Sequence, residues 1–199
     1  MPDLYVDLGA KAVAVLPFSW AADDDAPFAY AIVLDLVDRL YALEGLRVRG
    51  ARSTVGAVGR EREVREVGQS LGVQAVVDGA IRRVGGRVQV VARLTAVADG
   101  FQLWAARIER DEVDWFALVD EVVQGVMGPL NVRERAAKSE LPSLGAATGA
   151  YIAARFQVAM AAVDPSSSRA RIAEVSRVAA TSSHPRFVAL GLQADLDRD

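Results

Sequence analysis

Apolar and polar positions along the first 130 residues follow patterns that change from strand-like to helix-like and back. Ala12–Phe18 is continuously apolar, which is typical of a buried strand, and Pro17 fits only near the end of that strand. From Phe28 to Leu43, apolar side chains recur every three or four positions, which predicts an amphipathic helix. Leu46–Arg49 alternates apolar and charged residues, as a second strand does.

A second helix is predicted from Glu61 to Leu71, and Gly72 ends it. Three strand-like segments follow it: Gln74–Val84, Arg87–Ala98 and Phe101–Glu109. The pairs Gly85-Gly86 and Asp99-Gly100 separate them and suit the positive φ angles of two-residue hairpin turns. These segments predict a three-stranded antiparallel meander.

A third helix over Val113–Leu130 completes the order β-α-β-α-β-β-β-α. We therefore predict an α/β (α+β) domain over residues 1–131 with a five-stranded mixed sheet.

The two predicted turns set a register for the meander. With Val84 opposite Arg87, Asp78 faces Arg93. With Ala98 opposite Phe101, Thr95 faces Trp104 and Arg93 faces Ala106. One face then carries apolar side chains that helices can cover, namely Val77, Ile81, Val88, Val90, Leu94 and Leu103. The other face is polar around one large aromatic and carries Asp78, Arg82, Gln89, Arg93, Thr95, Gln102 and Trp104.

The last third of the chain changes to an alanine-rich, helical pattern. Residues 132–145 are predicted to be a linker, and residues 146–199 a helical-hairpin segment. Helices are expected over Thr148–Val163 and Arg169–Ala180, and a third from Arg186 to about Leu196. Two or three helices cannot bury their apolar faces against one another alone. We therefore expect this tail to dock on the domain or on another chain, which includes a second copy of this chain in a homo-oligomer.

Composition narrows the classes of protein. The absence of cysteine excludes disulfides, thiolate zinc sites and cysteine nucleophiles. No apolar stretch reaches the roughly 18 residues of a membrane span, and the acidic start lacks the layout of a signal peptide. We expect a cytoplasmic protein, or a periplasmic one if an upstream anchor or signal is missing.

Charge is unevenly spread along the chain. The net charge is −3, yet twelve arginines stand against six acidic residues between Arg47 and Arg110. The favoured interpretation is that these arginines line the solvated face of a sheet. The alternative is a nucleic-acid-associated module that uses this arginine-rich segment.

Residues 12–130 resemble the TolB N-terminal-like domains of bacteria. An ordered series of segments carries the resemblance: Val15–Phe18, Leu46–Ser53, Glu63–Val73, Asp78–Arg83, Arg87–Val90 and Leu103–Arg107. The resemblance implies an accessory, non-catalytic domain of the kind attached to adenylate cyclases or winged-helix regulators. The tail is similar to tetratricopeptide helices at its Asp164-Pro165 and His184-Pro185 breaks.

Catalytic chemistry is hard to assemble from these residues. The single histidine, His184, precedes a proline in a turn. The Asp23–Asp25 run could chelate Mg²⁺ or Ca²⁺, but it suits a solvated helix cap better. We therefore predict no catalytic residues, no metal, no cofactor and no enzyme activity.

One set of residues is a candidate binding site. Trp104 beside guanidinium groups suits stacking against a ring, a peptide or an anionic group. Its members are Trp104, Arg93, Arg82, Asp78, Thr95 and Gln102. The alternative is that Trp104 is covered by the tail helices or packs under Arg93. The sequence thus predicts a binding or regulatory module of a bacterial signalling or envelope-associated protein, with a protein, another domain or a small ligand as partner.

Overall fold

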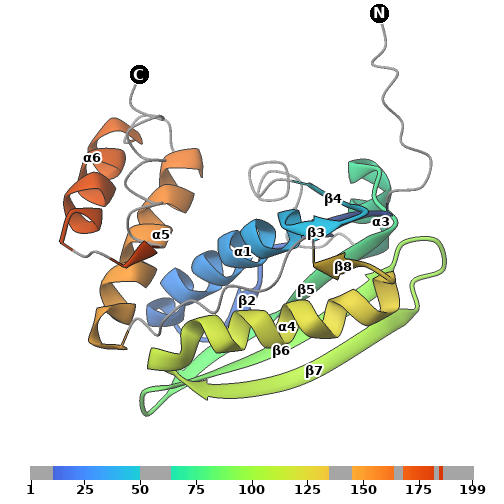
Figure 1. Ribbon diagram of the computed structural model, residues 1–199, viewed down its shortest axis with the longest axis horizontal. Coiled ribbons are helices and arrows are strands. Elements are labelled where there is room, and N and C mark those ends of the chain that lie inside the picture. The colour runs from blue at the N-terminus through green and yellow to red at the C-terminus, as the bar shows by residue number, and fades with distance from the viewer. Residues whose placement is uncertain (1–10, 50–63, 135–144, 164–167, 182–183, 186–199) are drawn as a thin grey trace, which may run out of the picture.

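The computed structural model describes residues 11–49, 64–134, 145–163, 168–181 and 184–185. Helices α1 (Ala26–Tyr41) and α4 (Trp115–Leu130) cover one face of a mixed sheet. Helix α3 (Val64–Leu71) packs on the other face, and the pair α5 (Thr148–Val163) and α6 (Ser168–Ala179) lies beside α1 (Figure 1). Short 3-10 turns occupy Asp23–Asp25, Glu112–Asp114 and Gly145–Ala147.

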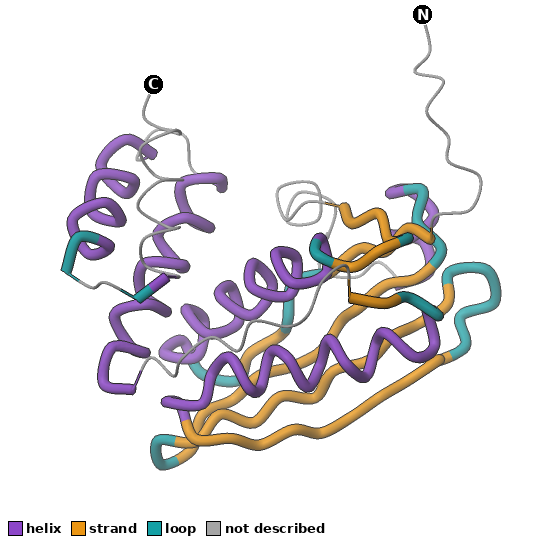
Figure 2. Tube along the Cα trace, viewed as in Figure 1, coloured by secondary structure: helices purple, strands orange, loops and turns teal. Residues whose placement is uncertain are grey.

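The main sheet has six strands, five of them in the order β4-β1-β5-β6-β7, with β2 beside β5 off this path. Figure 2 shows the strands in orange with the helices packed against them. Strand β1 is parallel to β4 and β5, and the rest of the path is antiparallel. The bounds are Lys11–Val15 for β1, Leu46–Arg49 for β4, Ala75–Val84 for β5, Arg87–Ala96 for β6 and Gln102–Asp111 for β7. The predicted fold class, with its mixed sheet and antiparallel meander, is confirmed.

Two small pairings were not predicted. Strand β2 (Ser19–Trp20) continues the line of β1 and pairs parallel to β5. Strand β3 (Leu43–Glu44) pairs with β8 (Arg133–Glu134) in a separate two-stranded sheet. Two-residue strands have too few positions to show alternation, so their pairing is set by the tertiary structure.

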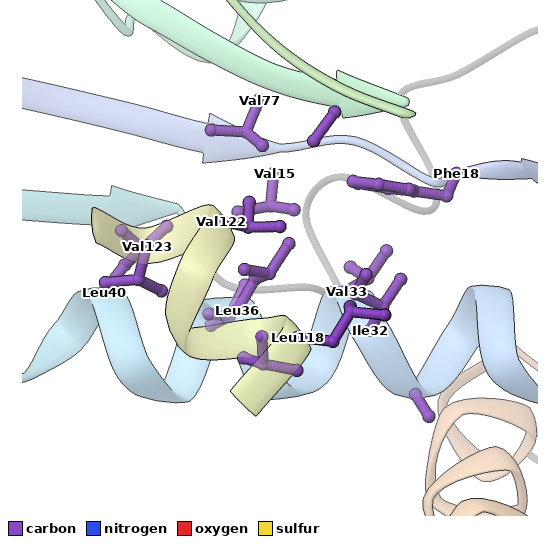
Figure 3. Close-up of a cluster of buried hydrophobic side chains, with 14 of the residues drawn as sticks. Val15, Phe18, Ile32, Val33, Leu36, Leu40, Val77, Leu118, Val122 and Val123 are labelled. Carbon is purple, nitrogen blue, oxygen red and sulfur yellow. The ribbon is translucent and has the colours of Figure 1, made fainter. Parts of the chain in front are cut away.

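The main hydrophobic core lies between the sheet and the helices α1 and α4. Figure 3 shows side chains of both helices meeting those of β1 and β5, among them Leu36, Val122, Val15 and Val77. All four are at most 1% exposed. Because burying each such side chain contributes about 1.5–3 kcal/mol, this layer fixes the helices over one face.

The start of α1 differs from the expected solvated cap. Asp25 is only 4% exposed, and its carboxylate makes no capping bond within the helix. Instead, its Oδ1 accepts the backbone N–H of Arg83 at 3.2 Å. Asp25 thereby ties the entry of α1 to β5.

The tail docks on the domain through a buried carboxylate. Asp35 of α1, 1% exposed, accepts hydrogen bonds from Trp115 Nε1 and Tyr151 Oη, both at 2.6 Å. Arg155 Nη2 lies 2.8 Å from Asp35 Oδ1 and 2.7 Å from Asp38 Oδ2. Three helices therefore meet at one carboxylate.

Electrostatics favour the charged form of Arg155. Burial lowers its pKa, but the carboxylates of Asp35 and Asp38 and the Tyr151 hydroxyl more than compensate, so the pKa is raised above its ordinary value. The guanidinium therefore stays charged between α1 and α5.

The hydrophobic core continues into the tail, where Ile152 and Val175 belong to the same cluster as α1 and α4. The described helices of the tail therefore dock on the domain of the same chain, as one of the two expected alternatives. The predicted linker lies mostly outside the described residues, as does the predicted third helix from Arg186. The domain boundaries stay a prediction.

Substitution of Arg155 tests the docking. Arg155→Met removes the cation and leaves two carboxylates facing each other, so we expect a loss of about 3–5 kcal/mol in the free energy of unfolding. Urea denaturation measures it. The milder Tyr151→Phe, which removes one donor to Asp35, should cost about 1–3 kcal/mol.

The matched control is Arg177→Met, which breaks an exposed ion pair with Glu174 on α6. Its denaturation midpoint should match that of the wild type. Wild-type stability in both Arg155→Met and Tyr151→Phe would contradict the role given to Asp35.

Candidate binding face of the sheet

The register between β5 and β6 is the predicted one. Val84 lies opposite Arg87, and Asp78 lies opposite Arg93. Gly85 and Gly86 have φ angles of +59° and +79°, as the two-residue turn requires.

The register between β6 and β7 differs from the prediction. Trp104 lies opposite Leu94, not Thr95, and Thr95 lies opposite Gln102. Arg93 lies opposite Ala105 rather than Ala106. Two changes combine. The connection between the strands is longer than predicted, which moves β7 by two residues at Thr95, and a register shift between Leu94 and Thr95 reverses one of them. The net one-residue change puts Trp104 on the other face of the sheet.

Burial of Val97 explains the longer connection. Strand β6 ends at Ala96, and Val97 turns its side chain, 6% exposed, into the cluster under α3. The Val97 backbone N–H donates to Gln74 O at 2.9 Å, so this residue leaves the ladder with β7. The connection is therefore longer than the predicted Asp99-Gly100 turn, although Gly100 does have a positive φ of +77°.

Trp104 consequently lies on the face covered by α4. A Cβ atom added at Gly125 of α4 would come within 2.1 Å of the Trp104 ring. The prediction that Trp104 joins the polar face is wrong, and so is the inward placement of Leu103, which is 45% exposed. The absent side chain of Gly125 makes the space for the indole.

The other predicted site residues lie on the opposite face. Arg93 Nε donates to Asp78 Oδ1 at 2.8 Å, which confirms the expected cross-strand pair. Arg82 Nε donates to Gln89 Oε1 at 2.8 Å one row further along. Thr95 and Gln102 face each other at the far end of the meander. The role of these five residues in binding stays a prediction.

A hollow of about 350 Å³ opens on this uncovered face, and we call it the open-face hollow. Its volume is within the range of small-molecule sites. It is lined by Ser19, Trp20, Ala21, Ala80, Ile81, Arg82, Gln89, Val91 and Arg107. Among the described helices, only α3 packs on this side of the sheet, at the β1 end.

Trp20 lines the edge of the hollow, where it pairs with the core residue Ile81, so its indole lies toward α1. It is 39% exposed, and its ring lies 5.7 Å from that of Tyr30 in α1. Sequence reasoning missed Trp20 because its position depends on the parallel pairing of β2 with β5. It also missed Arg107, although Trp104, Ala106 and Ile108 form an apolar alternation that leaves Arg107 on the other face.

The arginines of the open-face hollow differ from their neighbours in charge compensation. Arg93 is paired with Asp78, and Arg87 with Glu109. Arg82 bonds only the neutral amide of Gln89, and Arg107 has no ion-pair or hydrogen-bond partner in the described part of the chain. The hollow therefore carries two arginines that form no ion pair with a carboxylate of the described residues.

In the ranges that the structure describes, no group of three histidine, aspartate or glutamate side chains is placed to hold a metal ion. Within the same ranges, none of the helices has the length and apolar character of a membrane span. The cellular location stays a prediction.

Comparison with curated proteins finds a relative in Rhizobium meliloti (strain 1021). It is described as "Putative adenylate cyclase 3" and is 33% identical over 131 residues, which make up 65% of this chain. The chain spans only 22% of the length of that relative. No protein-family model matches the sequence.

Several solved structures resemble the chain at low identity. TolB from Acinetobacter baumannii matches with a TM-score of 0.43 and 14% identity, over 60% of this chain and 29% of TolB. Lipoprotein GNA1162 from Neisseria meningitidis matches with a TM-score of 0.44 and 19% identity, over 59% of this chain and 96% of the lipoprotein chain. A chain of the PelC dodecamer from Paraburkholderia phytofirmans matches with a TM-score of 0.43 and 21% identity, over 63% of this chain and 90% of the PelC chain.

TolB is thus among the matching structures, as the resemblance in the sequence implied. TM-scores this low carry no conclusion about function or assembly. The tetratricopeptide-like character of the tail stays a prediction.

The relative corrects one expectation. We predicted that the protein is not an enzyme, and a 33% identical protein described as an adenylate cyclase points to an enzyme instead. Sequence reasoning failed here because it looked for a reaction centre within these residues, whereas the name describes a much longer protein.

Two glycines of α4 test the placement of Trp104. Gly125→Ala should destabilise the protein by about 1–3 kcal/mol, because the new methyl group overlaps the indole. Gly128→Ala is the matched control, since a Cβ there meets no atom within 4 Å. It should stabilise the helix by up to about 1 kcal/mol. Equal thermal midpoints for the two variants would place Trp104 elsewhere.

Proposed function

We propose that this chain is a binding and regulatory module of an adenylate-cyclase-type signalling protein, which engages a ligand or partner through the open face of its sheet. The observation that carries this proposal is the open-face hollow, with Trp20, Arg82 and Arg107 at its wall. The identity with the Rhizobium meliloti relative supports the signalling context.

The arrangement of helices also supports a regulatory role. Helix α1 contributes Tyr30, which contacts Trp20 beside the hollow and Phe156 of α5, with ring centroids 5.7 and 5.5 Å apart. The hollow is therefore connected by packed rings to the docked tail. Binding at the hollow can bias the position of α5 through this contact chain.

The alternative of a nucleic-acid-associated module finds less support. Within the arginine-rich segment, Arg83, Arg87, Arg93 and Arg110 each pair with a carboxylate. Such pairs reduce the charge available for phosphate backbones. A module of this kind would bind nucleic acid with steep salt dependence, which a salt titration of the purified chain measures.

The test of the proposed function uses the full-length gene product that contains this chain. We expect it to convert ATP to cyclic AMP. When metabolites from a cell extract are present, the rate of cyclic AMP formation by the double variant Arg82→Gln/Arg107→Gln should differ from the wild-type rate about fivefold or more. The measurement is cyclic AMP formation per mole of enzyme.

The control is Arg47→Gln/Arg110→Gln, which removes the same charge. Arg47 lies on the edge strand β4, and Arg110 pairs with Glu121 of α4. Its rate should equal that of the wild type. Absence of cyclic AMP, or identical rates for the two double variants, would contradict the proposed function.

A further inference from the structure

We infer that the open-face hollow binds a phosphate monoester that carries a small apolar or aromatic body. This inference rests on the proposed function, since it names the ligand class of the same face. It follows from the charge, the spacing and the floor of the hollow.

Charge selects a dianion. Arg82 and Arg107 supply two positive charges that no described carboxylate compensates. A phosphate monoester carries about −1.5 to −2 at pH 7, whereas a single carboxylate would leave one guanidinium uncompensated. Guanidinium groups bind such oxyanions with two parallel hydrogen bonds.

The neighbouring acidic groups do not compete for these arginines. Glu109 is held by Arg87 and accepts from the amide of Gln89 at 3.2 Å. Asp78 is held by Arg93. The nearest carboxylates of the open face are thus already paired.

Spacing lets both arginines reach one ligand. Arg107 lies in the row of Val91 and Ala80, and Arg82 lies in the next row, opposite Gln89. One strand, β6, lies between the strands of the two arginines, so two inter-strand spacings put these strands roughly 10 Å apart. Long arginine side chains can converge over the small side chains of Ala80 and Val91.

The floor and wall suit an apolar body on the ligand. Ala80 and Val91 line the hollow from the open face, and Trp20 lines its edge. A ring bound to the phosphate can pack on this apolar surface while the arginines hold the charge. Inorganic phosphate lacks that second contact.

Isothermal titration calorimetry of the purified 199-residue chain tests the inference, with phenyl phosphate as the probe. We expect Arg107→Gln and Arg82→Gln each to weaken binding about tenfold or more, because each removes a charge-assisted bond. Arg110→Gln, on the same strand but on the α4 side, should bind like the wild type.

Two further probes separate the contributions. Inorganic phosphate should bind more weakly than phenyl phosphate, and so should benzoate, which has the ring but one charge. Benzoate binding as tightly as phenyl phosphate would overturn the requirement for a dianion. No heat with phenyl phosphate, or equal weakening in Arg110→Gln and Arg107→Gln, would overturn the site.

Failure of the inference is distinguishable from failure of the proposed function. If phenyl phosphate does not bind but Arg82→Gln/Arg107→Gln still changes cyclic AMP formation, the ligand class is wrong and the regulatory face stands. If phenyl phosphate binds with the expected losses but cyclic AMP formation never changes, the site stands and the proposed function fails.

Discussion

The Asp35 carboxylate organises the helices of this protein. A carboxylate that is 1% exposed would be costly without partners, and here it has an indole N–H, a phenol hydroxyl and a guanidinium around it. These donors come from α4 and α5, so the placement of α1 over the sheet and the docking of the tail depend on the same atoms. Tyr151 and Ile152 of helix α5 are fully buried, and together with this polar contact they give α5 a defined position on α1.

Placing α1, α4 and the tail on one side leaves much of the other side of the meander uncovered by described helices. That asymmetry creates the open face. Helix α3 protects only the end near β1, where Val67 and Val76 share a small second core. The remaining rows carry paired charges, except where Arg82 and Arg107 border the open-face hollow. The candidate site is therefore a consequence of how the helices are distributed.

Much of the architecture could be predicted from the sequence, because alternation and glycine turns are local signals. The Gly85-Gly86 turn fixed the Asp78–Arg93 pair correctly. The second turn failed because a buried Val97, held by contacts with α3, ended β6 two residues early. That two-residue change alone would leave Trp104 on its predicted face, and the one-residue shift between Leu94 and Thr95 moves it to the other face. Contacts between distant segments also place Trp20 and Asp35, whose partners lie far along the chain. The sequence shows that Arg82 and Arg107 are charged, but it does not show that they line the same hollow as Trp20.

The central claim is that Trp20, and not Trp104, borders the binding face. The chain has three tryptophans, whose indole N–H signals can be assigned by single Trp→Phe variants and followed by NMR during titration with phenyl phosphate. The account predicts that the Trp20 signal shifts while those of Trp104 and Trp115 stay in place. A shift of the Trp104 signal with an unmoved Trp20 would contradict it.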